Sequence, residues 1–250
     1  MKRVLLRVAY DGTGYCGWAV QPNGISVESV LNRHLSELLK EDIHVIGASR
    51  TDAGVHAQGN VAVFDTAARM GADRISFALN TRLPEDIRIE ESREVPADFH
   101  PRFQDVVKTY EYKILNRTFP DPCLRLYSLF YHYPLDIEKM RRSAAQLVGT
   151  HDFTSFCTAK PEVTNRVRTI YSIDIIKEGD LIRIRIKGSG FLYNMVRIIV
   201  GTLIRAGGGK TDPDDITRIL EARDRSLAGD TARAQGLTLV EIYYPALQEP

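Results

Sequence analysis

The order of strand-like and helix-like segments in the first half of the chain limits the folds that it can adopt. Apolar runs typical of strands and apolar residues spaced along one face of a helix follow one another as strand, helix, strand, strand, helix, strand. The segments are residues 4–10, a helix capped by Ser26, 43–48, 60–64, a short helix at 75–79, and 87–89. This order is the βαββαβ pattern of ferredoxin-like domains.

The second half repeats the same order with an additional helix. It contains a strand at 106–115, a helix capped by Asp136, a hairpin of 169–176 and 181–187, helices at 191–206 and 213–222, and a last strand at 237–243. We therefore expect an α+β protein with two ferredoxin-like halves, residues 1–105 and 106–250. Their mixed, mostly antiparallel sheets are expected to join into one larger sheet with the helices on one face.

Charge is balanced over the chain but divided unevenly between the halves. The 250 residues are 44% hydrophobic and 26% charged, with a net charge of +1, which is ordinary for a globular protein. Residues 1–105 carry 12 Lys and Arg against 15 Asp and Glu, whereas residues 106–250 carry 21 against 17. The second half is thus the more basic one, which fits phosphate contacts without establishing them.

Cysteine usage and the N-terminus favour a reducing, cytoplasmic location. The three cysteines, Cys16, Cys123 and Cys157, are far apart and show no C-x-x-C spacing, so neither a disulfide framework nor a zinc site is indicated. The N-terminus enters a strand directly and lacks the apolar core of a signal peptide. No apolar run approaches the roughly 18 residues of a membrane span.

A polar turn lies between the strand-like runs at 43–48 and 60–64. It reads Arg-Thr-Asp-Ala-Gly-Val-His-Ala from Arg50 to Ala57 and presents one carboxylate, Asp52. Gly54 permits a positive φ or a close approach of the backbone to a ligand. Taken alone, these residues are equally typical of an ordinary solvated turn, so a catalytic role for Asp52 needs support from other stretches.

One such stretch is an apolar helix that contains an arginine. Arg197 lies within residues 191–206, which are apolar on most of the helix circumference. A buried, unpaired guanidinium is strongly destabilising, so Arg197 either extends to solvent along the helix surface or meets a buried anion. We expect Arg197 to pair with Asp52 and to keep that carboxylate ionised; an arginine at the solvent-exposed rim is the alternative.

The other stretch is the strand at 106–115, which carries two tyrosines. Tyr110 and Tyr112 are two residues apart and therefore lie on the same face of the strand. Aromatic rings on a sheet surface can stack on nucleobases. Packing in the core is the other possibility for either ring.

These three stretches together resemble the tRNA pseudouridine synthase A (TruA) family. The resemblance extends from Tyr10-Asp11-Gly12-Thr13 to Gly236-Leu237 and covers nearly the whole chain. It implies an isomerase that converts uridine to pseudouridine at tRNA positions 38 to 40, in the anticodon stem-loop. It also implies a homodimer that needs no cofactor and no metal.

The resemblance further implies a role for four residues. Asp52 corresponds to the catalytic residue and Arg197 to its ion-pair partner. Tyr110 corresponds to the aromatic residue against the substrate uridine. Arg50 corresponds to a residue that helps to flip the target base and takes its place in the stack.

Five positions depart from the usual family pattern. Ser49 occupies a position where glycine is common, Cys16 one where His or Phe is common, and Arg233 one where proline is common; Ala19 and Val20 replace a more polar pair. None of these is a predicted site residue. The departures therefore bear on RNA contacts rather than on the expected activity.

Three other functions deserve comparison with an isomerase. Two βαββαβ halves also describe a non-catalytic protein with tandem RNA-recognition domains, but the aromatic RNP pattern of such domains is missing. A metal-dependent phosphate-ester hydrolase built on Asp52 would need further carboxylates nearby. A nucleotide-binding loop at Gly12 and Gly14 lacks both common glycine-rich phosphate-binding motifs.

Overall fold

The protein is an α+β structure with two compact units. A computed structural model describes residues 1–22, 24–158 and 164–247, and within these residues the chain forms five α-helices and a ten-stranded, mostly antiparallel sheet. Unit 1 comprises Met1–Asp105 with Leu239–Pro250, and unit 2 comprises Val106–Thr238. The predicted fold class is confirmed.

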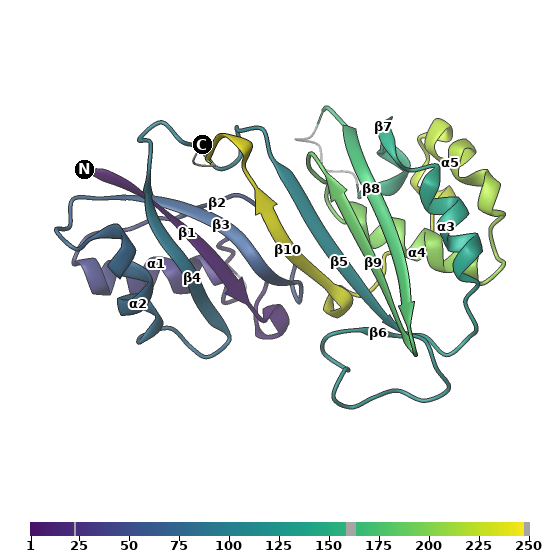
Figure 1. Ribbon diagram of the computed structural model, residues 1–250, viewed down its shortest axis with the longest axis horizontal. Helices are drawn as coiled ribbons and strands as arrows, with labels where there is room; N and C mark the ends of the chain where they lie inside the picture. The colour runs from purple at the N-terminus through teal and green to yellow at the C-terminus, as the bar shows by residue number, and fades with distance from the viewer. Residues whose placement is uncertain (23, 159–163, 248–250) are drawn as a thin grey trace. The chain divides into compact units, whose positions relative to one another are not determined.

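Unit 1 is built around its first strand (Figure 1). Its elements are β1 (Lys2–Tyr10), α1 (Val27–Leu39), β2 (Ile46–Gly47), β3 (His56–Thr66), α2 (Ala72–Asn80), β4 (Ile87–Val95) and the last strand, β10 (Leu237–Tyr243). The strand order is β4-β1-β3-β10, with β2 paired to β3. Strand β1 is antiparallel to both neighbours, and its residues Val4, Leu6 and Val8 are fully buried.

A β-bulge interrupts the pairing of β1 with β3 near the end of β1. Val8 pairs with Asn60, whereas Tyr10 pairs with Ala57, so β3 has one residue more than β1 over this stretch. Such bulges bend a strand and redirect its side chains, and they are common beside active sites.

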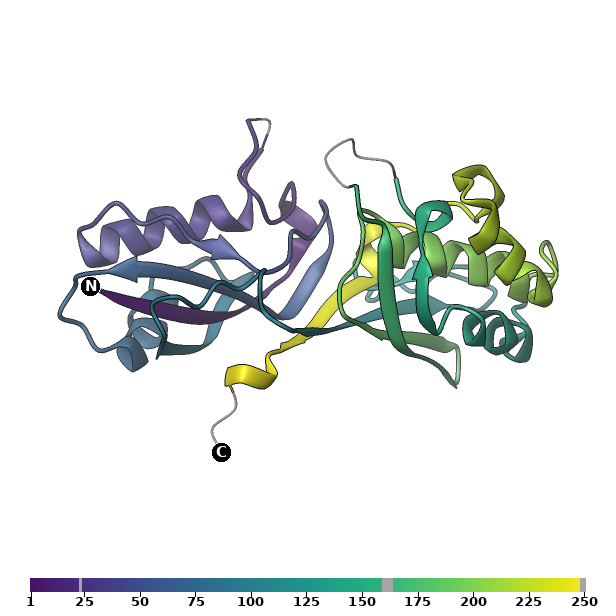
Figure 2. The ribbon, with the colours of Figure 1, turned by 90° about the horizontal axis from the view of Figure 1, so that it is seen from above.

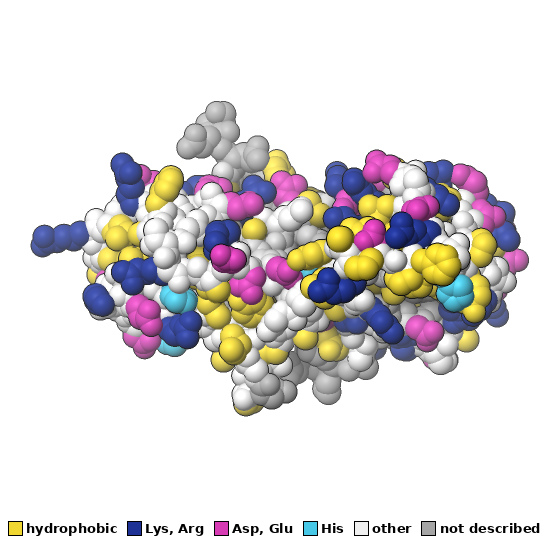
Figure 3. Space-filling view, turned by 90° about the horizontal axis from the view of Figure 1, so that it is seen from below, with side chains coloured by type: hydrophobic (Ala, Val, Ile, Leu, Met, Phe, Trp, Pro, Cys, Tyr) yellow, Lys and Arg dark blue, Asp and Glu magenta, His cyan; other side chains and the backbone are white. Residues whose placement is uncertain are grey.

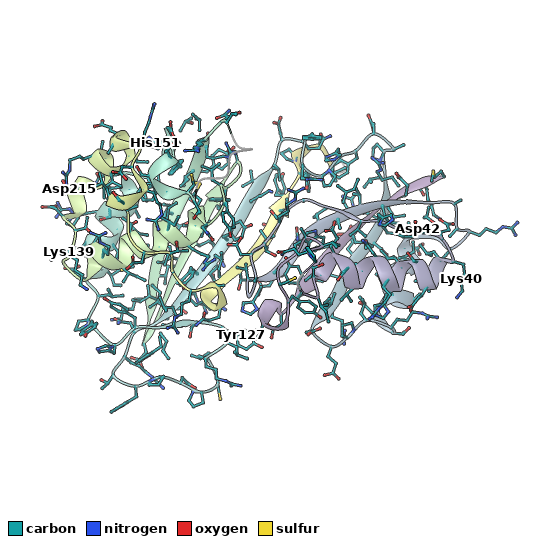
Figure 4. All side chains as sticks on the ribbon, turned by 180° about the vertical axis from the view of Figure 1, so that it is seen from behind. Lys40, Asp42, Tyr127, Lys139, His151 and Asp215 are labelled. Atoms are coloured by element: carbon teal, nitrogen blue, oxygen red, sulfur yellow. The ribbon has the colours of Figure 1, made fainter. Side chains whose placement is uncertain are left out.

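Helix α1 begins and ends where local chemistry dictates. Ser26 is the N-cap, as predicted: its side chain accepts from the Ser29 amide, and the Ser29 side chain accepts from the Ser26 amide. The helix ends at Lys40, whose φ of 60° is left-handed. Figure 4 labels Lys40 and Asp42 at this end of the helix.

The strand predicted at 43–48 is shorter than expected. The strand β2 comprises only Ile46–Gly47, and the Ala48 amide makes one further hydrogen bond to the Val61 carbonyl of β3. The Ile43 amide donates instead to the side chain of Ser36, and the Val45 amide to the side chain of Asn32. Two polar side chains of α1 thus hold the backbone at 43–45.

Unit 2 contains the predicted elements from the strand at 106–115 to the helix at 213–222, and in addition two short strands at 129–130 and 149–152 that the sequence did not predict. The strand predicted at 237–243 lies mostly in unit 1. The sheet order of unit 2 is β5-β9-β8-β7, with β6 parallel to β5 (Figures 1 and 2). Its elements are β5 (Val107–Leu115), β6 (Leu129–Phe130), α3 (Ile137–Ala145), β7 (Gly149–Asp152), β8 (Val167–Glu178), β9 (Leu181–Gly188), α4 (Met195–Gly207) and α5 (Ile216–Ala222). Gly179, with φ of 59°, forms the turn of the predicted β8–β9 hairpin. The Asp136 side chain caps α3 as predicted, accepting from the Lys139 amide.

Helix α4 begins later than predicted. The apolar pattern suggested a start at Phe191, but the helix begins at Met195, after Asn194 in the left-handed region with φ of 61°. Asparagine tolerates this conformation better than most residues. Residues 191–194 therefore form a turn before the helix rather than its first turn.

No helix in the described parts of the chain combines the length and the apolar character that a membrane span requires.

The capping box of α1 is expected to contribute measurably to stability. Ser26→Ala leaves the Ser29 amide without its acceptor inside a buried site, and we expect a loss of about 1 kcal/mol. For a protein of this size, that corresponds to a thermal midpoint lower by about 2–4 °C. Circular dichroism melting would measure it, and Glu37→Ala on the exposed side of the same helix is the control. Equal midpoints for both variants would contradict the capping role.

Candidate active site

Asp52 lies in a loop whose backbone is fixed by hydrogen bonds. The Ala48 amide donates to the Val61 carbonyl (2.7 Å), the Trp18 amide to the Thr51 carbonyl (3.1 Å), and the Val55 amide to the Asp52 carbonyl (3.1 Å). Gly54 adopts φ of 76°, which closes the turn between Asp52 and Val55. The loop thus holds a half-buried Asp52 in a defined conformation.

Two glycines that follow β1 in the sequence pack directly against this loop. A Cβ atom at Gly17 would lie 2.6 Å from the Thr51 carbonyl oxygen, and Gly17 has φ of 105°. A Cβ atom at Gly12 would overlap the carbonyl group of Val55. Gly12 and Gly17 therefore permit a close approach of two backbone segments, whereas a Cβ atom at Gly14 would meet nothing within 4 Å.

His56 ties the loop to the end of β1. Its ring is buried, and Nδ1 lies 3.0 Å from an Asp11 carboxylate oxygen and 3.1 Å from the Gly12 amide nitrogen. The Gly12 amide donates to Nδ1, and the Asp11 carboxylate lies beside the same nitrogen. His56 thereby joins the turn after β1 to the start of β3.

The two tyrosines of β5 have different surroundings. Tyr112 is fully buried, its hydroxyl donates to the Arg233 carbonyl (2.7 Å), and burial raises the pKa of Tyr112 well above its usual range. Tyr112 is therefore a core residue that stays protonated and holds the 233 loop. Tyr110 is 9% exposed and meets the ring of Phe191 edge to face, with centroids 5.2 Å apart.

Arg197 is half-buried in the first turns of α4, and its guanidinium is held by its own unit. Its Nε donates to the Ala232 carbonyl (2.7 Å), and Nη1 donates to the Asn194 side-chain oxygen (3.0 Å). The Asn194 amide group donates in turn to the Thr158 hydroxyl (3.1 Å). The guanidinium is thus anchored, unlike a side chain that extends freely into solvent.

The loop that carries Ala232 is packed tightly on α4. A Cβ atom at Gly201 would overlap the Asp230 carbonyl oxygen, and the Gly229 amide donates to the Thr202 hydroxyl (2.8 Å). The Ala232 amide also donates to the Arg197 carbonyl (3.1 Å). Residues 229–232 and the start of α4 therefore hold each other in place around Arg197.

The predicted site residues fall into two pairs. Asp52 and the exposed Arg50 belong to one loop of unit 1, while Tyr110 and Arg197 belong to unit 2. The pairing of Asp52 with Arg197 stays a prediction. In the described part of the chain, no three His, Cys, Asp or Glu side chains are grouped as a metal site would require.

The sequence did not reveal the residues that hold Arg197 and the Asp52 loop. Asn194 and the Ala232 carbonyl hold Arg197, and Tyr10 and Asn60 lie beneath the Asp52 loop. The only available signal was an asparagine just before the apolar face of α4 begins. Backbone acceptors such as the Ala232 carbonyl leave no signature in the sequence.

The close contact at Gly201 yields a prediction for unit 2. Gly201→Ala forces the Asp230 carbonyl away from α4, and overpacking of this kind costs about 1–3 kcal/mol. We expect a clearly lower thermal midpoint. Gly190→Ala is the matched control, because its Cβ would meet only the Arg168 side chain at 3.9 Å. Similar midpoints for the two variants would show that the loop does not depend on Gly201.

Known proteins match the chain over most of its length. A family model described as tRNA pseudouridine synthase matches residues 7–104 and 143–245. Proteins named tRNA pseudouridine synthase A from Exiguobacterium sibiricum, Halalkalibacterium halodurans and Brevibacillus brevis are 48%, 48% and 47% identical to the chain, respectively. The alignments cover 98%, 95% and 98% of this chain, and 98%, 90% and 100% of the relatives. The family expected from the sequence is thereby confirmed: the chain belongs to the tRNA pseudouridine synthase family.

Proposed function

We propose that the protein converts uridine to pseudouridine in the anticodon stem-loop of tRNA, at tRNA positions 38 to 40, with Asp52 as the catalytic residue. Its family makes it an isomerase of tRNA uridine. The observation that carries the proposal for Asp52 is its place on a loop whose backbone is fixed on both sides. A fixed carboxylate is what a reaction at a single nucleoside needs.

The reaction asks for an anion beside the nucleoside. It breaks the N1–C1′ bond, turns the uracil and forms a C5–C1′ bond, while C5 loses a proton and N1 gains one. An ionised Asp52 has three possible roles: it attacks C1′, adds to the uracil ring, or removes a proton from the ribose. In each case the detached uracil must stay in the pocket until the new bond forms. No redox partner enters this balance.

The other three site residues have distinct proposed tasks. Arg197 pairs with Asp52, and its anchorage to Ala232 and Asn194 supports a fixed position for that charge. Tyr110 contacts the substrate base. Arg50, which is exposed on the same loop as Asp52, enters the stem-loop in place of the flipped base.

Recognition of tRNA is proposed to depend on shape and backbone. On the face that Figure 3 presents, Lys and Arg side chains are spread among acidic ones instead of forming one patch. Scattered cations suit contacts to phosphates at many points. In this proposal the protein acts as a cytoplasmic homodimer, in which residues 1–105 bring the Asp52 loop and residues 106–250 bring the Tyr110 strand and the Arg197 helix.

A passive RNA-binding protein is the less favoured function. The relatives that match almost the whole chain are named as synthases. An anchored arginine inside an apolar helix also has no evident use in passive binding.

Replacement of Asp52 tests the proposal directly. Asp52→Asn removes the negative charge and keeps the shape, so we expect pseudouridine formation on an unmodified tRNA transcript to fall at least about a thousandfold. Carbodiimide blocking and primer extension would map the product, without added metal or cofactor. Asp42→Asn, an exposed aspartate of the same unit, is the control and should match wild type. Binding without product in all three proteins would favour the passive function.

A double-mutant cycle tests the pairing of Asp52 with Arg197. If the two side chains interact, Asp52→Asn and Arg197→Gln should be less than additive in the free energy of unfolding, with a coupling of about 0.5–3 kcal/mol. Arg205→Gln is the control on the same helix, since Arg205 donates to the Ala228 carbonyl instead. Coupling within error of zero for Arg197 would remove the ion pair from the proposal.

A further inference from the structure

A buried network of hydrogen bonds supports the Asp52 loop within unit 1. We infer that Tyr10 and Asn60 are positioning residues for Asp52, which they affect through the backbone of residues 49–51. The inference rests on the proposed function, because it assigns Asp52 as the residue to be positioned. Neither Tyr10 nor Asn60 belongs to the Arg50–Ala57 stretch.

Asn60 lies at the centre of this hydrogen-bond network. Its side chain is completely buried, and all four of its hydrogen-bonding positions are used. The oxygen accepts from the Ser49 amide (3.3 Å) and the Val61 amide (2.9 Å). The amide nitrogen donates to the Ser49 carbonyl (3.0 Å) and the Tyr10 hydroxyl (3.3 Å). Asn60 therefore makes hydrogen bonds to both the amide and the carbonyl of Ser49, the residue before Arg50.

Tyr10 extends the hydrogen-bond network to Thr51, on the other side of Arg50. Its buried hydroxyl lies 2.7 Å from the Thr51 hydroxyl oxygen and also receives the hydrogen bond from Asn60. The Asn60 amide is a donor only, so the Tyr10 hydroxyl oxygen is the acceptor in that bond, while either hydroxyl can donate in the contact with Thr51. The Tyr10 ring also contacts Trp18, at 5.9 Å between ring centroids, and the Trp18 amide holds the Thr51 carbonyl.

Hydrogen bonds thus fix the residues on either side of Arg50: Asn60 holds Ser49, and Tyr10 holds Thr51. The β-bulge between Val8 and Tyr10 accompanies this arrangement, since Tyr10 pairs with Ala57 while its hydroxyl reaches Asn60. Asp52 follows Thr51 directly, so any movement of the Thr51 backbone also displaces the Asp52 carboxylate. A small displacement of a catalytic group slows the chemical step while leaving remote binding contacts intact.

Tyr10→Phe tests the inference by removing a single oxygen atom. We expect kcat for pseudouridine formation to fall about tenfold, with KM for tRNA unchanged within about twofold. Tyr244→Phe is the matched control. Tyr244 is equally buried in unit 1, but its hydroxyl donates to the Pro101 carbonyl (2.7 Å) and is not part of the hydrogen-bond network that supports the Asp52 loop. Thermal midpoints of both variants would separate a loss of stability from a loss of positioning.

Thr51→Val removes the same hydrogen bond from its other end and keeps the β-branched shape. We expect a similar fall in kcat, and a Tyr10→Phe/Thr51→Val double variant no slower than the slower single variant. Wild-type kcat in Tyr10→Phe, or an equal fall in Tyr244→Phe, would overturn the inference. Absence of product with the wild-type enzyme would instead refute the proposed function, so the two failures are distinguishable.

Discussion

Asp52 stands on backbone that belongs to no helix or strand, so its position depends on hydrogen bonds that other segments make to that backbone. Buried groups supply them: the Trp18 amide holds the Thr51 carbonyl, and Asn60 holds both backbone groups of Ser49. A buried polar network of this kind is stable only when each member finds its partner. The glycines at 12 and 17 follow from the same requirement, because only a residue without Cβ lets the supporting segments come close enough.

Unit 2 solves a related problem for a cation. A guanidinium in an apolar helix must find acceptors, and α4 provides them through a neighbouring loop and through the residue before its own start. Asn194 serves twice, as the left-handed residue that precedes the helix and as an acceptor for Arg197. The fold thus supports the Asp52 loop and Arg197 in similar ways, each through one side chain, Asn60 or Asn194, and one backbone group, the Trp18 amide or the Ala232 carbonyl.

The sequence predicted the elements where the signal is local. Ser26 and Asp136 cap their helices, and the hairpin at Gly179 forms as its turn residues indicate. The strand at 43–48 was predicted too long: residues 43–45 are held by Ser36 and Asn32 of the preceding helix and are not paired with β3. Helix α4 was predicted too early, because the apolar pattern runs through the turn at 191–194 and does not reveal a backbone reversal. The four candidate site residues came from recognisable motifs, whereas their supports depend on tertiary contacts that no local pattern encodes.

The composition of unit 1 has a consequence for how the chain folds. Its sheet ends in β10, which is separated from β3, its neighbour in the sheet, by more than a hundred residues. During synthesis from the ribosome, residues 1–105 emerge long before β10 does. Until then, the edge of β3 that later pairs with β10 is covered only in part, by β2 and the Ala48 amide. An incompletely paired edge is the part of a sheet most prone to pair with other chains. Pairing across such a separation in sequence is also slow. The sheet that carries the Asp52 loop is therefore complete only after β10 has been synthesised and has paired with β3. A chain that ends before β10 would leave that edge of β3 incompletely paired permanently.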